Sequence, residues 1–255
     1  MLLTGAWRAI AFLLVLGIMP SLIWADASDE SQQAQLFVAQ VKGDVSVLHG
    51  GQQHSANPPE PLAQSDRVVT GADSTAYLEF QNGGVVEVGA NSDVTVKQLE
   101  ITPQDFKARF LLALGKFRAK VKKLTSSSST FEVEAGGVVA GVRGTVFGVD
   151  YDKIRQQVDA QTYEGSIFTR SGGKEEIVDK GYSMAVEKTG LSVKSPLTGR
   201  QMNSFRDFVD VSGQLEEKKQ QLLQQMHDNL MNRMPDAVKQ HENDLNNALG
   251  QKLPF

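Results

Sequence analysis

Short runs of alternating apolar and polar residues make up most of the chain between Leu36 and about residue 195. Residues 67–70 and 76–80, for example, are rich in β-branched, aromatic and other apolar residues. Turn-forming stretches separate these runs, among them the proline-rich residues 57–61 and the Asn-Gly pair of residues 81–84, which favours a type I′ hairpin. Short strands at this spacing predict an all-β domain.

Residues 116–122 alternate strictly between basic and apolar side chains, and Lys123 follows. On one predicted strand, the alternation places Phe117, Ala119 and Val121 on one face and Lys116, Arg118, Lys120 and Lys122 on the other. The basic face could bind an anionic surface, such as peptidoglycan, lipid headgroups or an acidic protein. The sequence favours the simpler interpretation of a solvated strand face, whose charges also discourage edge-to-edge pairing.

Beyond Pro196 the period changes from two to that of a helix. Ser212 is the expected N-cap of a first helix, and Pro235-Asp236 is expected to begin a second helix that runs to about Leu249. One helical stripe consists of Leu215, Leu222, Met226, Leu230 and Met234. The two helices are expected to pack on the β-domain, to pair with each other or to mediate self-association. The stripe spans fewer than three heptads, so a stable isolated coiled coil is not predicted.

The first 25 residues have the pattern of a secretory signal peptide. Arg8 is followed by an eleven-residue apolar run, Ala9–Met19, and by small residues suited to cleavage. This run is shorter than the about 20 apolar residues that span a bilayer, although counting residues 22–24 leaves an uncleaved anchor open. The predicted organisation is a signal peptide (1–25), a disordered leader (26–35), a β-domain (36–195) and a helical segment (196–255). The mature protein is expected to be periplasmic or secreted, with no membrane span after cleavage.

The composition of the chain argues against several classes of function. The 255 residues carry 26 basic and 30 acidic side chains, a net charge of −4, which does not predict a nucleic-acid partner. The chain has no cysteine, which excludes disulfides, thiol catalysis and cysteine metal sites. None of the four histidines has a histidine partner four residues away, so no metal site is predicted, and no cofactor is expected.

Residues 133–150 are the most informative stretch, because five glycines lie among β-branched and aromatic residues in eighteen positions. Such a mixture disfavours a helix, where each glycine costs roughly 1 kcal/mol relative to alanine. Its centre, Val-Arg-Gly-Thr-Val-Phe at residues 142–147, resembles the signature of the FecR domain. Residues 66–76 and 163–167 resemble two further blocks of that family. The residues that form this structural signature are Gly71, Asp73, Gly141, Gly144, Phe147 and Gly165.

The resemblance implies a twisted β-solenoid or roll followed here by a helical segment. It also favours a strand at residues 109–114, although Thr102–Asp105 looks like a helix N-cap and Gly115 could end a helix. The founding type of the family receives a signal from an outer-membrane transporter and passes it to a cytoplasmic sigma factor. Only seven residues precede Arg8, so we expect a free-standing exported FecR-domain protein without the sigma-binding region.

Within the signature, Arg143 and Thr145 are the candidate residues for binding a ligand or partner. A guanidinium can bind a carboxylate through two hydrogen bonds. The sequence favours a structural role, in which Arg143 binds carbonyls across a turn that Gly144 bends. Residues 141–144 lack the ending of a phosphate loop, and residues 126–129 lack a nucleophile elbow, so no enzyme is predicted. We expect a module that binds an envelope protein or ligand, with structural docking on peptidoglycan or membrane through the basic face as the alternative.

Overall fold

A computed structural model of the chain describes residues 35–187, 190 and 192–233. The predicted signal peptide, nearly all of the predicted leader and the predicted second helix lie outside the described residues. In the described part, no helix has both the length and the apolar character needed to cross a membrane.

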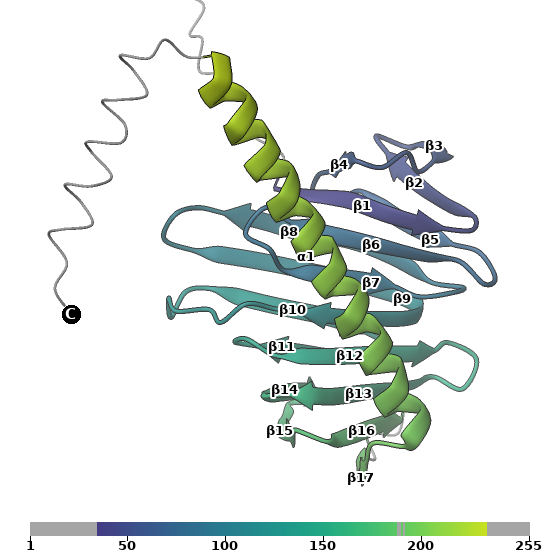
Figure 1. The fold of residues 1–255 in the computed structure, drawn as a ribbon. Coiled ribbons are helices and arrows are strands. Elements are labelled where there is room, and N and C mark those ends of the chain that lie inside the picture. The colour runs from purple at the N-terminus through teal and green to yellow at the C-terminus, as the bar shows by residue number, and fades with distance from the viewer. Residues whose placement is uncertain (1–34, 188–189, 191, 234–255) are drawn as a thin grey trace, which may run out of the picture. The chain divides into compact units, whose positions relative to one another are not determined.

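Seventeen strands and one helix make up the described residues (Figure 1). The strands are β1 (Leu36–Lys42), β2 (Val45–His49), β3 (Gln52–Ser55), β4 (Glu60–Leu62), β5 (Arg67–Thr70), β6 (Thr75–Phe80), β7 (Val85–Val88), β8 (Asp93–Ile101), β9 (Phe106–Lys120), β10 (Thr130–Ala135), β11 (Val138–Val142), β12 (Val146–Asp152), β13 (Gln157–Glu164), β14 (Ser166–Ser171), β15 (Lys174–Asp179), β16 (Tyr182–Glu187) and β17 (Ser192–Pro196). The helix α1 (Gly199–Arg233) follows them.

The strand pairings build two sheets that share β9. The first sheet has the order β4-β1-β6-β7-β9-β12-β13-β16-β17. The second sheet has the order β3-β2-β5-β8-β9-β10-β11-β14-β15. Among the described strands, all neighbours are antiparallel except β9 and β10. The two sheets pack against each other, and neither closes on itself.

Glycines bend the chain where it passes from one sheet to the other. Gly43 lies between β1 and β2, Gly115 lies within β9, and Gly165 lies between β13 and β14. Their φ angles are +76°, +98° and +77°, and a Cβ on any of them would come within 2.6 Å of a neighbouring side-chain atom. Glycine is required at these corners because other residues rarely adopt such φ angles and have no room for a Cβ there.

The core between the sheets consists of the inward positions of both sheets. Alternation along each strand sends apolar side chains inward, and burying each large one contributes roughly 1.5–3 kcal/mol. Ring centroids 5.1–6.4 Å apart link six phenylalanines at its centre: Phe80, Phe106, Phe110, Phe117, Phe131 and Phe147.

The mainly-β class predicted from the sequence is confirmed, as is the strand at residues 109–114. Thr102–Asp105 forms the turn between β8 and β9, where the Thr102 hydroxyl accepts a hydrogen bond from the Asp105 N–H (2.9 Å), a capping bond used in a hairpin. The hairpin predicted at residues 81–84 is confirmed, since it joins β6 to β7, but its turn is not of type I′. Only Gly83 has a positive φ, and its N–H donates to the Phe80 carbonyl over 2.9 Å. The solenoid or roll is not confirmed, since the sheets stay open.

Helix α1 starts earlier than predicted. Thr198 caps its N-terminus, because its hydroxyl accepts from the Gln201 N–H (3.3 Å) and the Gln201 side chain accepts from the Thr198 N–H (2.8 Å). This reciprocal pair is a capping box. The predicted cap at Ser212 is wrong, because Ser212 is buried inside the helix and donates to the Val209 carbonyl over 2.8 Å.

Candidate functional site

The segment that carries the signature is the corner at which the chain leaves the second sheet and enters the first. Strand β11 belongs to the second sheet and β12 to the first, and residues 143–145 join them. Gly144 has a φ of +123°, and a Cβ there would lie 2.6 Å from the Cα of Lys123. Backbone hydrogen bonds on both sides hold the two segments together, from Val121 N–H to the Thr145 carbonyl (2.9 Å) and from Leu124 N–H to the Arg143 carbonyl (3.1 Å).

The remaining signature residues of this region pack around the same corner. Phe147 is fully buried in the core. A Cβ on Gly141 would lie 2.0 Å from the ring of Phe168, and a Cβ on Gly165 would lie 2.6 Å from Cγ2 of Thr145. Thr145 is buried, and its hydroxyl has no hydrogen-bond partner among the described residues. These positions shape the corner through close packing.

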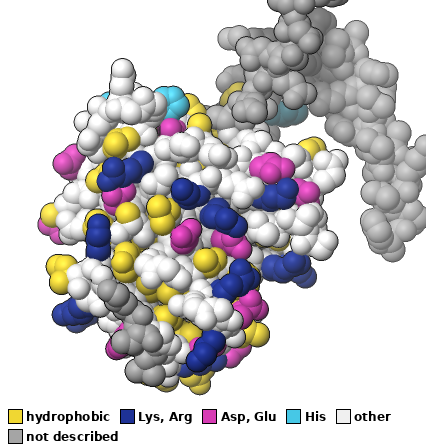
Figure 2. All heavy atoms as spheres, turned by 180° about the vertical axis from the view of Figure 1, so that it is seen from behind, with side chains coloured by type: hydrophobic (Ala, Val, Ile, Leu, Met, Phe, Trp, Pro, Cys, Tyr) yellow, Lys and Arg dark blue, Asp and Glu magenta, His cyan; other side chains and the backbone are white. Residues whose placement is uncertain are grey.

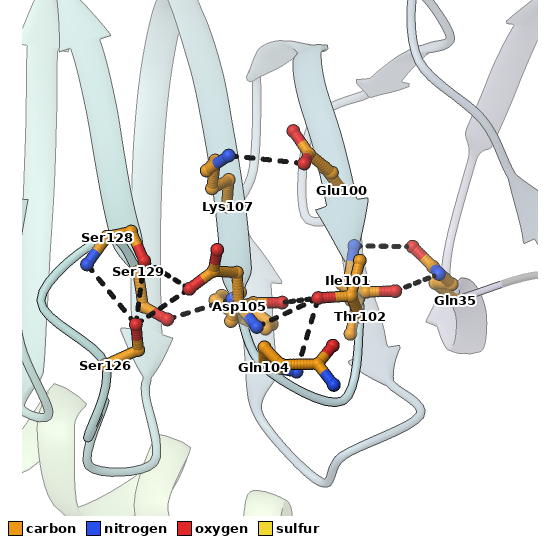
Figure 3. A network of polar contacts seen from close by, with 11 residues as sticks. Gln35, Glu100, Ile101, Thr102, Gln104, Asp105, Lys107, Ser126, Ser128 and Ser129 are labelled. Carbon is orange, nitrogen blue, oxygen red and sulfur yellow. Dashed lines mark hydrogen bonds and ion pairs between the residues drawn. The ribbon is translucent and has the colours of Figure 1, made fainter.

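Arg143 lies on the surface, where it donates to the Ser127 carbonyl over 3.0 Å. It thereby ties the corner to the loop of residues 126–129, which belongs to a polar network at the end of the second sheet (Figure 3). In that network, Asp105 accepts hydrogen bonds from Ser128 and from Ser126 (2.7 Å), and these bonds lower the pKa of the Asp105 carboxyl. This geometry agrees with a structural role for Arg143, and its role in ligand or partner binding stays a prediction.

Gly71 and Asp73 occupy the corresponding corner between β5 and β6, again where the chain moves from the second sheet to the first. Asp73 has a φ of +53°, which few residues other than glycine adopt. Gly71 donates its N–H to the Asp44 carbonyl (2.9 Å), and Asp44 donates its N–H to the Ser74 hydroxyl (2.9 Å). The two signature blocks therefore fold as equivalent corners.

The basic face predicted at residues 116–122 forms part of the outer surface of the first sheet, and α1 crosses that surface (Figure 1). Arg118 is buried there, pairs with Glu87 at 2.6 Å and lies over the ring of Phe205, 5.7 Å from its centroid. Lys122 pairs with Glu216 of α1 at 3.3 Å. Lys116 and Lys120 are exposed and half-buried, respectively. Two of the four cations, Arg118 and Lys122, are therefore already paired with carboxylates of the protein itself.

The sequence did not predict two neighbouring carboxylates, Asp150 and Asp159, that lie beneath the first turn of α1. Asp150 and Asp159 face each other across β12 and β13, and the amide of Gln161 donates to both, over 3.1 and 3.0 Å. Gln201 of α1 donates to Asp159 over 2.9 Å. Burial raises the pKa of Asp150, while Arg118 opposes this shift, and burial followed by the neighbouring Asp150 charge raises the pKa of Asp159. No local pattern signals this pair, because a helix distant in sequence buries it.

The outer surface of the second sheet carries paired charges of both signs. Ion pairs join Lys107 to Glu100 (3.2 Å), Arg109 to Glu132 (2.6 Å) and Arg170 to Glu175 (3.2 Å). Figure 2, viewed from the side opposite to Figure 1, shows basic and acidic side chains interspersed with scattered apolar ones. We call these six charged residues, with Phe168 and Glu134, the open face.

Residues 66–168 match the family model of the FecR protein. The chain carries a FecR domain. The match begins in the first signature block and ends in β14, so the FecR domain includes both corners and the whole of β9. A search of curated proteins gives no match.

Two crystal structures of "a putative anti-sigma factor" from Parabacteroides distasonis are similar to this FecR-domain chain. Each is 13% identical with a TM-score of 0.46, and each alignment covers 55% of this chain and 63% of the other. The similarity therefore spans less than two thirds of either chain.

Proposed function

We propose that this FecR-domain protein is a non-catalytic binding module of the cell envelope that takes part in cell-surface signalling through a protein partner. The observation that carries the proposal is the FecR match over residues 66–168. FecR proteins are regulatory and associated with the envelope, and export of this chain through residues 1–25 would place the domain there.

The open face is the surface that we propose for the partner. Helix α1 covers much of the first sheet, and the second sheet has no described helix across it (Figure 1). A protein interface outside its core is about as polar as the rest of a protein surface, and arginine is enriched there. The basic residues of the open face would attract a uniform polyanion, and the acidic residues beside them would repel it. This mixture of charges favours a protein partner over a glycan or lipid surface.

Docking on peptidoglycan or membrane through Lys116, Arg118, Lys120 and Lys122 is the weaker alternative. Arg118 already pairs with Glu87 under α1, and Lys122 already pairs with Glu216. An anionic surface would have to compete with these carboxylates for two of the four cations. No feature of the described residues favours this second function.

Photo-crosslinking in cells tests the proposal. A photoreactive amino acid replaces Glu134 on the open face of the full-length tagged chain, and the control replaces the exposed Glu217 of α1. We expect one protein adduct from position 134 and none from position 217. The proposal fails if position 134 gives no protein adduct. It also fails if the protein is recovered mainly with peptidoglycan or membrane and high salt releases it, since salt screens exposed charges.

A further inference from the structure

One face of α1 changes its surroundings halfway along the helix. Its first half packs this face on the outer surface of the first sheet, and the same face then continues with apolar residues. The positions follow one another at steps of three and four, as expected for one helical face: Phe205, Phe208, Ser212, Leu215, Lys219, Leu222, Met226 and Leu230. The first four are buried.

The second half of this face has nothing to pack on in the described part of the chain. Lys219 contacts Glu79 (2.6 Å) and the Gln81 carbonyl (3.1 Å) near the edge of the first sheet. Beyond this point α1 continues past β1 (Figure 1). Four large apolar side chains there are half exposed or more, Leu222 at 52%, Leu223 at 50%, Met226 at 60% and Leu230 at 57%. We call these four residues the free stripe.

The sequence that follows α1 has the length and pattern to cover the free stripe. Residues 235–249 begin with Pro-Asp and place Val238, His241, Leu245 and Leu249 at helical steps of three and four. A helix over these residues would be about 21 Å long, which equals the length of α1 from residue 219 to residue 233 at about 1.5 Å per residue. Folding back at residues 234–236 would place Val238 beside Leu230 and Leu245 beside Leu223.

We propose that residues 236–249 pack antiparallel on the free stripe, so that the C-terminal part of the chain forms a two-helix arm at the edge of the first sheet. The covering segment is covalently attached, and a short connection gives it a high effective concentration at the stripe. A second copy of the chain would have to form its contact from fewer than three heptads without that advantage. The rim of the stripe is rich in glutamine and asparagine, so it offers few charges to steer a charged partner.

Engineered cysteines test this arrangement cleanly, because the chain has no cysteine of its own. The test variant is Leu223→Cys/Leu245→Cys in the full chain. The matched control is Gln221→Cys/Leu245→Cys, because residue 221 lies at nearly the same height on the opposite side of α1. Both variants are oxidised and followed by non-reducing electrophoresis and intact mass, with thermal unfolding as the check that each is folded.

We expect an intramolecular disulfide in monomeric protein, formed about tenfold faster in the test variant than in the control, because a disulfide needs Cα atoms close together. Disulfide-linked dimers of the test variant would overturn the proposal and assign the stripe to a second copy. Equal rates in the two variants would also overturn it, since the segment would then have no preferred side of α1.

Discussion

Replacing Gly144 by alanine should destabilise the protein through two separable effects. The φ of +123° lies in a region that only glycine enters without strain, and forcing another residue into it costs about 1–3 kcal/mol. The new Cβ would also lie 2.6 Å from Cα and 3.2 Å from N of Lys123, both of them backbone atoms that cannot rotate away. Overpacking of this kind costs about 1–3 kcal/mol, so the expected total is about 2–6 kcal/mol.

Two neighbouring glycines separate these effects. Gly137 has a φ of +84° with no atom within 4 Å of an added Cβ, so Gly137→Ala measures strain alone. Gly141 has an ordinary φ, but its Cβ would lie 2.0 Å from the end of the Phe168 ring, so Gly141→Ala measures crowding against a movable side chain. We expect Gly144→Ala to cost more than Gly137→Ala by at least about 1 kcal/mol, which is the contribution of the contact with Lys123.

Urea unfolding and thermal unfolding of the purified chain measure these differences. For a protein of this size, 1 kcal/mol shifts the melting temperature by about 2–4 °C. Gly144→Ala should therefore melt at least about 4 °C below the wild type. Equal melting temperatures for Gly144→Ala and Gly137→Ala would refute the reasoning, because they would show that the Lys123 backbone moves aside without cost.

The remaining predictions concern the region beneath α1. The raised pKa values of Asp150 and Asp159 mean that the folded state binds more protons than the unfolded state, so their contribution to stability is fully present below the unfolded carboxyl pKa. That contribution is lost as the pH rises through the folded pKa values. The Asp150→Asn/Asp159→Asn variant should therefore lose less stability than the wild type as the pH rises over this range. Identical pH profiles of the two proteins in urea unfolding would contradict this expectation. Thr198→Ala should remove about 0.5–2 kcal/mol of helix stability by breaking the capping box with Gln201. Faster amide exchange in the first turn of α1 would show the loss, and unchanged exchange would argue against the cap.

The strands of the two sheets could be predicted because burial on one face has a period of two. The alternation at residues 116–122 correctly predicted which side chains point into the core, among them the buried Phe117. The order of the strands could not be predicted in this way, because period two says which face is buried and not which neighbour is paired. Nor does period two show where the chain changes sheets, and only the structure shows that Gly43, Gly115 and Gly165 all lie at corners between the sheets.

The helix and the site beneath it were harder to predict for a physical reason. Ser212 looked like a cap because serine is common there, yet the Thr-x-x-Gln pattern at residues 198–201 is the stronger signal and marks the true start. Asp150 and Arg118 stand at outward positions of their strands, where charged residues are ordinarily solvated. Arg118 is buried because Phe205 of α1 lies against its guanidinium, and Asp150 is partly buried close by. The sequence of the strands alone does not show that a distant helix covers them.

The signature residues around Gly144 form the connection between the two sheets of the domain. Strand β11 contributes to the sheet that bears the open face, and after the corner at Gly144 the chain continues as β12 in the sheet that α1 covers. Because Gly144 leaves no room between the corner and the Lys123 backbone, the two sheets are held in a fixed relation at this point. Arg143 extends the same constraint to the loop of residues 126–129 at the end of the second sheet. A partner bound at the open face would therefore act on a surface whose position relative to α1 is set by the corner.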